Sequence, residues 1–270
     1  MNSEFEYCVN KATPAGSNLY YATLFETADS RSIILPLYAL HNEFIDCLTS
    51  SPDPGVTRLK FSWWHEELDR LINNNPRHPV TQALKSLIET HPVISNILID
   101  HLSCIESIIA NNNTLKYQDW LQHYIKRLGR FWLALNSLEQ DHRDASLIIE
   151  NGGLIFSLEI ITNYRLFSGK MAGFLPVDLV EKYTHSSYAS PTPEVFEDLL
   201  AIYKNSLEDT HMKLKQSNYK PALFNLICNK LAQATIKEII IDGSRIMEHK
   251  IHLTPIRKLC LSVFSRMGLN

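Results

Sequence analysis

Apolar and polar residues recur with α-helical spacing along almost the whole chain. Over residues 59–71 they separate onto two faces of a helix, and the asparagine-rich segment that ends in Pro76 stops the pattern. Similar breakers separate the other periodic stretches, because proline lacks a backbone donor and clashes with the preceding turn. The pattern predicts further helices at residues 18–28, 30–49, 79–90, 92–111, 117–137, 143–167, 176–183, 193–216, 220–247 and 255–266.

Alternation typical of β-strands is scarce. The triplet Ile239, Ile240 and Ile241 is the one tempting stretch, but it lies inside a helical pattern that spans residues 231–245. No internal repeat, low-complexity tract or long linker divides the chain. We therefore expect residues 1–270 to form one all-α domain, a multi-helix bundle with a central cavity between its helices.

Composition limits the classes of partner. The 270 residues are 45% hydrophobic, which suits a sizeable core, and the formal net charge of −3 argues against nucleic acid. Five scattered cysteines without metal-ligand spacing fit a reducing compartment. No secretory or transit signal is visible, and charges interrupt every apolar run before about 18 residues. We expect a cytoplasmic protein with at most peripheral membrane contact.

Three segments carry a resemblance to a known family. The first segment reads SNLYYATLF at residues 17–25, followed by Arg31 and by LYAL at residues 37–40. The second segment reads FSWWHEELDRL at residues 61–71, followed by HPV at residues 78–80. The third segment contains Arg165 and the FLP triplet at residues 174–176. In order and rough spacing they resemble motifs of the squalene/phytoene synthase family, enzymes that join two prenyl diphosphates head to head.

The resemblance implies the isoprenoid (terpenoid) synthase fold and a magnesium-dependent reaction. In the family, two aspartate-rich motifs on facing helices hold the magnesium ions that bind the diphosphates, since Mg²⁺ prefers oxygen ligands in octahedral geometry. Aligned through Tyr38, the first motif falls on residues 45–49, where Ile45 and Thr49 replace its two aspartates. Asp46 is retained as the neighbouring acid, and Asn42 stands where the family has an arginine.

The second motif is also altered. Leu166 follows Arg165, Lys170 stands at the position of the other motif acid, and no acid occurs before Asp178. The sequence therefore predicts no metal site and no confident catalytic residue. The positions that the resemblance places at the remnant cavity are Ser17, Tyr20, Tyr38, Asn42, Ile45, Asp46, Thr49, Glu159, Asn163, Arg165 and Lys170.

Other polar and aromatic groups have structural explanations. Trp63 and Trp64 are typical of helix packing, although they can also line a lipid pocket. The acids of residues 66–69 lie beside Arg70, which predicts a solvated, salt-bridged face rather than a metal site. Gly152 and Gly153 indicate a helix interruption without a phosphate-loop pattern.

Glu159 is harder to explain, because it lies in a strongly apolar helix and a buried carboxylate needs a partner. We expect Asn163, Tyr164 or another helix to bind it. The family usually has a glutamine here, which points to a polar role in the cavity wall.

Two segments near the C-terminus, residues 249–252 and 255–267, also have more than one interpretation. His249 and His252 are the nearest approach to a metal-binding pair, but a lone pair three residues apart is weak evidence. Residues 255–267 combine helical spacing of apolar residues with three cations. They predict a last core helix with a charged outer face; the alternative is a helix that lies on an anionic membrane surface.

Two functions stay open. The leading hypothesis is a non-catalytic member, or pseudoenzyme, whose cavity accepts a prenyl or other lipid or whose surface binds a protein partner. It resembles the family's mitochondrial branch, the complex I assembly factor, which also lacks the aspartates; this suggests a role in assembly of a respiratory enzyme. The alternative is a prenyl-diphosphate transferase acting on farnesyl or geranylgeranyl diphosphate, with Mg²⁺ as its cofactor, recruited through Glu43, Asp46 and Glu159.

Overall fold

The computed structural model describes residues 3–110, 115–136, 144–167, 174–186, 190–216 and 222–268, and within these ranges it contains helices and no strand. The prediction of an all-α protein is confirmed. The helices are α1 (Ser3–Ala12), α2 (Asn18–Ala22), α3 (Ala28–Thr49), α4 (Pro54–Ile72), α5 (Pro79–Thr90), α6 (Val93–Ala110), α7 (Tyr117–Trp120), η1 (Leu121–Ile125), α8 (Lys126–Leu135), α9 (Ala145–Thr162), η2 (Tyr164–Phe167), α10 (Val177–Thr184), α11 (Pro193–Gln216), α12 (Leu223–Ile241) and α13 (Pro255–Arg266).

Several helices begin where local side chains satisfy the first backbone amides. The Asp53 carboxylate accepts a hydrogen bond from the Gly55 amide at 2.7 Å, and Pro54 is the first residue of α4. Thr254 caps α13 in the same way, with Pro255 next in the chain. A capping oxygen binds an otherwise unpaired donor, and proline presets the helical φ angle. These starts are therefore properties of the local sequence.

Element boundaries differ from the predictions at several places. The helix expected at 18–28 ends at Ala22, and the helix expected at 143–167 divides into α9 and η2. Helix α1 was not predicted, because only Cys8 and Ala12 of its ten residues are buried and its apolar face is narrow. The helix expected at 117–137 is α7, one π-helical turn (η1) and α8. The helix expected at 220–247 ends at Ile241, because Gly243 turns the chain with φ at +71°. The isoleucine triplet is helical, as predicted.

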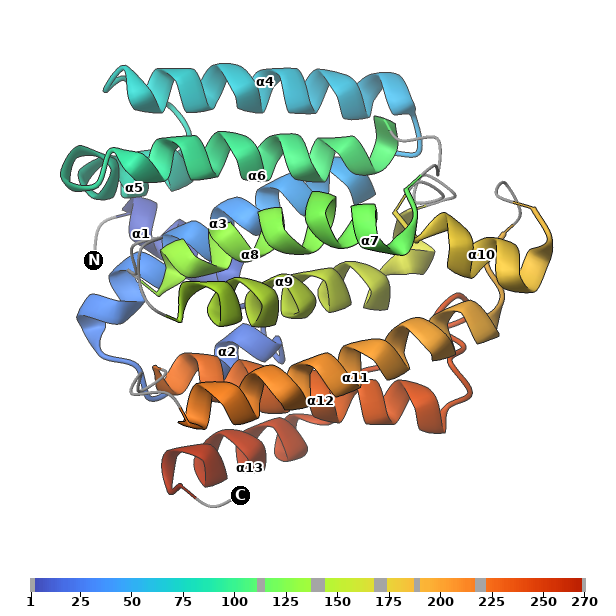
Figure 1. Ribbon diagram of the computed structural model, residues 1–270. Coiled ribbons are helices and arrows are strands. Elements are labelled where there is room, and N and C mark those ends of the chain that lie inside the picture. The colour runs from blue at the N-terminus through green and yellow to red at the C-terminus, as the bar shows by residue number, and fades with distance from the viewer. Residues whose placement is uncertain are drawn as a thin grey trace.

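Helix α9 packs against both α8 and α11 in the middle of the bundle (Figure 1). The expected interruption at Gly152 and Gly153 is wrong, because both residues lie inside α9. A Cβ atom on Gly152 would lie 2.0 Å from the Trp132 side chain, and one on Gly153 would lie 2.0 Å from the Ile125 carbonyl oxygen. The glycines are therefore close-approach positions that let α8 and η1 reach the α9 backbone.

Among the described residues, α9 is also the one helix that is long and apolar enough to cross a membrane. Its 18 residues have a mean hydropathy of 1.4, and 67% of them are buried inside the protein. Length and composition alone do not separate a membrane span from a core helix. The burial of α9 is what a core helix of a bundle shows.

Glu67 corrects the prediction of a solvated acidic face on α4. Its side chain is fully buried and accepts hydrogen bonds from the backbone amides of Arg77 and His78, from the Thr81 hydroxyl and from the Arg70 guanidinium. The carboxylate therefore joins α4 to the segment that begins α5. Glu66, with a side chain 66% exposed and paired with Arg70, fits the prediction, and Asp69 is exposed as well.

Helix α13 fits the prediction of a charged outer face only in part, because Arg257 and Arg266 are exposed but the third cation, Lys258, is buried. Its buried residues are Lys258, Ser262 and Ser265, all of them polar. The exposed side includes Ile256, which is 76% exposed, with Leu259, Phe264 and Met267. This helix therefore turns its polar side inward and much of its apolar side outward, and it lies at the end of the bundle opposite α4 (Figure 1).

Candidate functional site

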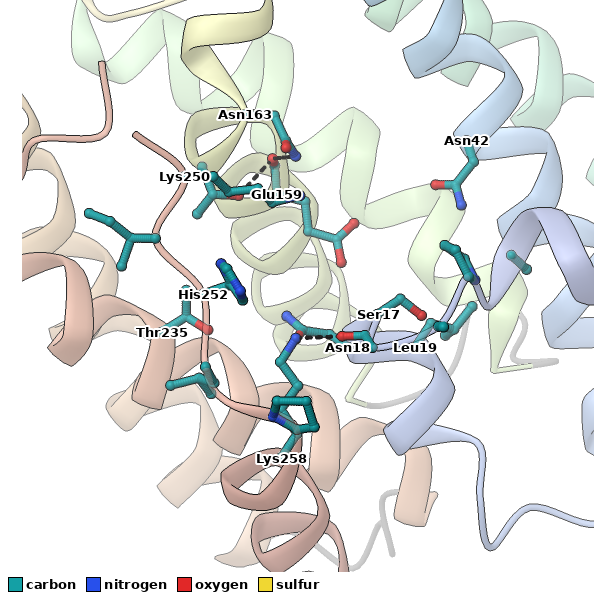
Figure 2. A pocket seen from close by; sticks show the side chains of 18 of the residues that line it. Ser17, Asn18, Leu19, Asn42, Glu159, Asn163, Thr235, Lys250, His252 and Lys258 are labelled. Carbon is teal, nitrogen blue, oxygen red and sulfur yellow. Dashed lines mark hydrogen bonds between the residues drawn. The ribbon is translucent and has the colours of Figure 1, made fainter. Parts of the chain in front are cut away.

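A cavity of about 630 Å³ lies between the N-terminal segment, α3, α9, α12 and the C-terminal segment (Figure 2). This volume lies within the range of small-molecule sites, about 300–1,000 Å³. A second, smaller pocket of about 30 Å³ shares Tyr38 and Glu159 with this cavity and is also lined by the apolar residues Ile155, Leu158 and Cys228. The main cavity is lined by Ala12, Pro14, Ala15, Gly16, Ser17, Asn18, Leu19, Tyr38, Asn42, Glu159, Thr162, Asn163, Thr235, Lys250, Ile251, His252, Leu253, Pro255 and Lys258.

Glu159 supplies the carboxylate of this lining. It accepts a hydrogen bond from the Tyr38 hydroxyl on α3, so the expected partner on another helix is present. Asn163 donates to the Glu159 backbone carbonyl rather than to its side chain, at 2.8 Å. Burial raises the pKa of the Glu159 carboxyl to about 7, against the lowering effects of Tyr38, Lys250 and Lys258. The carboxyl can therefore gain or lose a proton near neutral pH.

Two buried histidines lie behind Glu159. His41 Nε2 is 3.9 Å from Glu159 Oε2, and His41 Nδ1 is 2.9 Å from His101 Nε2. Burial lowers the pKa of His41 to about 3, and the pKa of His101 is lowered by burial and by the charges of His41 and Arg127. The His101 ring stacks on Phe131 with centroids 3.8 Å apart. Both rings are therefore neutral, and they connect the carboxyl to the core.

The C-terminal segment contributes two lysines and one histidine to the lining. Lys258 comes from the inward side of α13, and Lys250 and His252 come from the segment before that helix (Figure 2). The Lys258 ammonium donates a hydrogen bond to the Gly16 carbonyl at 2.7 Å. Burial and the nearby Lys250 charge lower the pKa of Lys258, while the Glu159 charge raises it. One carboxyl thus shares the cavity with two lysines.

The sequence-predicted positions divide into three groups. Ser17, Tyr38, Asn42, Glu159 and Asn163 line the cavity together. The second group is outside its lining: Tyr20, Ile45, Asp46, Thr49 and Arg165. Lys170 lies outside the described residues.

The acids expected to recruit a metal do not converge. Glu43 and Asp46 border a separate depression of about 320 Å³ beside Trp63 and His78. Both acids contact Lys11 of α1, at 3.1 Å and 2.5 Å from its ammonium nitrogen. Glu159 lines the other cavity, so these three carboxylates belong to two different sites.

Sequence reasoning missed Lys250 and Lys258, and it set His252 aside as half of a weak metal pair. Lys258, Ser262 and Ser265 form a polar stripe at helical spacing, which was a readable signal. The sequence does not show which stripe of such a helix faces inward.

Comparison with known proteins places this cavity in context. Residues 12–158, more than half of the chain, match the family described as squalene/phytoene synthase. The chain belongs to the squalene/phytoene synthase family. No curated protein matches the sequence.

Solved structures with the family's fold extend over nearly the whole chain. Squalene synthase HpnC from Alicyclobacillus acidocaldarius is similar with a TM-score of 0.68 and 13% identity, over 90% of this chain and 95% of that chain. A dehydrosqualene synthase in complex with a ligand is similar with a TM-score of 0.78 and 13% identity, over 98% and 96% of the two chains. The predicted isoprenoid synthase fold is confirmed.

The donor set of the cavity does not fit the magnesium cluster that the squalene/phytoene synthase family implies. Mg²⁺ binds through oxygen ligands, usually including one or two carboxylates. Among the described residues, Glu159 is the single acidic side chain of the lining, and no group of three or more His, Cys, Asp or Glu side chains able to bind a metal ion is present. The segment 166–177, which includes residues outside the described ranges, contains no acid.

Proposed function

We propose that this family member binds an anionic, prenyl-type lipid in its cavity and does not carry out magnesium-dependent prenyl coupling. One observation carries the proposal: among the described residues, the cavity is lined by one carboxyl, that of Glu159, together with Lys250 and Lys258, where two facing sets of aspartates would be needed. A relative of similar fold was solved with a ligand, which supports a small-molecule role for the shared architecture.

The physical argument against coupling concerns charge at the leaving group. Ionising a prenyl diphosphate requires cations held against its oxygens, and magnesium ions do this only when protein oxygens fix their positions. Ile45 and Thr49 offer no carboxylate, and Asp46 is paired with Lys11. The lysines can bind a phosphate but cannot assemble a metal cluster.

The test is binding and turnover of farnesyl and geranylgeranyl diphosphate by the purified protein, with Mg²⁺ and then with EDTA. We expect binding in both conditions and no coupled hydrocarbon. Magnesium-dependent formation of a coupled product would overturn the proposal and would support the alternative of a prenyl-diphosphate transferase.

We also propose peripheral membrane contact through α13. Its exposed apolar residues Ile256, Leu259 and Phe264, with Met267 directly after the helix, lie on the same segment as Arg257 and Arg266. Apolar residues combined with cations are typical of helices that bind anionic lipid surfaces. The same helix carries Lys258 into the cavity, so this contact would place the cavity close to a source of lipid.

The assembly role remains a proposal that rests on resemblance to the complex I assembly factor, through the altered aspartate motifs and the Arg165 and FLP segment. Proximity labelling in cells, followed by measurement of complex I content after depletion of the protein, tests it. Unchanged complex I content would contradict this part of the proposal.

A further inference from the structure

Lys258 is a buried cation without a matching anion. Its side chain belongs to a residue that is 5% exposed, and the hydrogen bond that the structure gives its ammonium group goes to the Gly16 carbonyl. In the described part of the chain, no carboxylate oxygen lies within 4.0 Å of its ammonium nitrogen, although fourteen other pairs of a basic and an acidic side chain lie within that distance. A buried charge costs free energy unless an opposite charge or several hydrogen bonds offset the lost water.

The surroundings of Lys258 are arranged for an anion rather than for a metal. Lys250 and His252 border the same cavity, and the side chains of Ser17 and Asn18 add hydrogen-bond donors (Figure 2). An ammonium group has three donor hydrogens, and the Gly16 carbonyl uses one of them. Among the described residues no other acceptor binds this ammonium group, so two hydrogens remain for ligand oxygens. Lys250, His252 and Lys258 belong to the C-terminal segment, whereas Ser17 and Asn18 belong to the N-terminal segment, and all five border the cavity together with Glu159.

We propose that Lys258 and Lys250 bind the phosphate or diphosphate group of a ligand directly, without a metal ion. The inference rests on the proposed function and extends it by naming the groups that hold the anion. It also gives a physical reason for the disagreement between this cavity and a magnesium cluster: lysines already supply positive charge, and a second set of cations would be repelled. The phosphate can belong to a lipid or to a free ion, and the probes below distinguish these sources.

The experiment measures dissociation constants in EDTA by calorimetry for farnesyl diphosphate, inorganic pyrophosphate and farnesol. Wild type is compared with Lys258→Met, Lys250→Met and Lys237→Met. Lys237 is an exposed lysine on α12 outside the cavity lining and serves as the matched control. Loss of a charged hydrogen bond is expected to weaken binding of farnesyl diphosphate roughly 10- to 100-fold in Lys258→Met, with a smaller loss in Lys250→Met and none in the control.

The outcomes separate this inference from the proposed function. Farnesyl diphosphate binding that disappears in EDTA, or that is as weak as farnesol binding, overturns direct binding by lysine and leaves a lipid cavity. Pyrophosphate binding as tight as that of farnesyl diphosphate supports the anion site and contradicts the lipid. Absence of binding by all three probes overturns both.

Folding of the variants is checked without ligand. Because Lys258 lacks a counter-ion, Lys258→Met is expected to keep or raise the thermal midpoint. If Lys258→Met lowers the thermal midpoint instead, the proposal is tested by the binding of farnesyl diphosphate to Lys250→Met and to the charge-preserving Lys258→Arg. Lys250 is exposed, so its removal leaves the core intact. Unchanged binding by Lys250→Met together with lost binding by Lys258→Arg would contradict the proposal.

Discussion

Glu67 shows how one buried carboxylate can organise a connection between two helices. It accepts hydrogen bonds from both backbone amides and side chains that lie 3 to 14 positions away in the sequence. Burial alone would raise its pKa, but the hydrogen bonds from His78, Thr81, Arg70 and Arg77 outweigh burial and lower it. Glu67 is therefore ionised in the folded protein at neutral pH.

Glu67→Gln is expected to lower the free energy of unfolding by about 2–4 kcal/mol, because an amide cannot accept from all of these donors. The matched control is Glu66→Gln, which touches the same Arg70 from an exposed position and should change stability by less than about 0.5 kcal/mol. Urea unfolding at pH 7 measures both. The lowered pKa means that the contribution of Glu67 is lost as pH falls through its folded-state pKa, so the difference between wild type and variant should shrink in acid.

Glu159 should give stability the opposite dependence on pH. Its pKa rises from an ordinary value of 4.5 to about 7 on folding, so the folded state holds a proton that the unfolded state releases. Stability is therefore lost as pH rises from about 4.5 through about 7. Glu159→Gln keeps an acceptor for Tyr38 and removes this loss. The stability of the variant relative to wild type should therefore increase as pH rises across that range.

Thermal midpoints of wild type and Glu159→Gln at a series of pH values check this expectation. Burial lowers the pKa values of His41, to about 3, and of His101, so both rings stay neutral across this range in wild type. Glu181→Gln, at an exposed position of α10, is the control. Parallel curves for wild type and Glu159→Gln would show that the carboxyl does not take up a proton on folding.

At the scale of elements, the contact of α8 with α9 depends on glycine. Gly152→Ala places a Cβ atom 2.0 Å from the Trp132 ring, which cannot move because it is buried and donates to Asn225. We expect a loss of at least about 3 kcal/mol in the free energy of unfolding. Gly243→Ala adds a Cβ atom in open space at a residue with φ +71°, and it should lower the free energy of unfolding by only about 1 kcal/mol. Equal effects in denaturant unfolding would contradict this account of the helix contact.

Helix α13 makes a second prediction at this scale. Replacement of Ile256 and Met267 by glutamine should reduce cosedimentation with vesicles of phosphatidylcholine and phosphatidylglycerol by roughly 10-fold, because each exposed side chain loses apolar transfer energy. Leu59→Gln changes a residue that is 72% exposed on α4, at the opposite end of the bundle, and should have no effect. Equal binding by both variants would mean that α13 is not the lipid contact.

At the scale of the whole molecule, the cavity joins segments that are far apart in the chain. Residues 12–19, α3, the end of α9 and residues 250–258 contribute to one lining. A ligand that binds this lining should slow amide hydrogen exchange at residues 15–19 and 250–258 together, while α4 stays unchanged, because binding favours the closed state of every contributing segment. Mass spectrometry with and without farnesyl diphosphate in EDTA measures this. Protection confined to one segment would show that the ligand binds elsewhere.

Much of the fold could be predicted because its determinants are local. Helical spacing, proline and asparagine breakers and capping residues act within a few positions, so α3, α5 and α13 were predicted nearly to their ends. The motifs around Tyr38 and Trp64 were sufficient to indicate the family. At the site, Tyr38, Asn42 and Glu159 were found because the resemblance fixed their positions.

The tertiary structure alone decided which polar groups are buried and which charges meet. Glu66 and Glu67 are neighbours of the same chemical type, yet only Glu67 is buried, because the start of α5 folds over it. Lys258 faces inward because α13 packs against α2 and α12 with its polar side, a choice that periodicity leaves open. The sequence by itself determined the helices and the family, since these depend on local spacing and motif order; the cationic cavity depends on contacts between residues 12–42, 159–163 and 250–258, which only folding brings together.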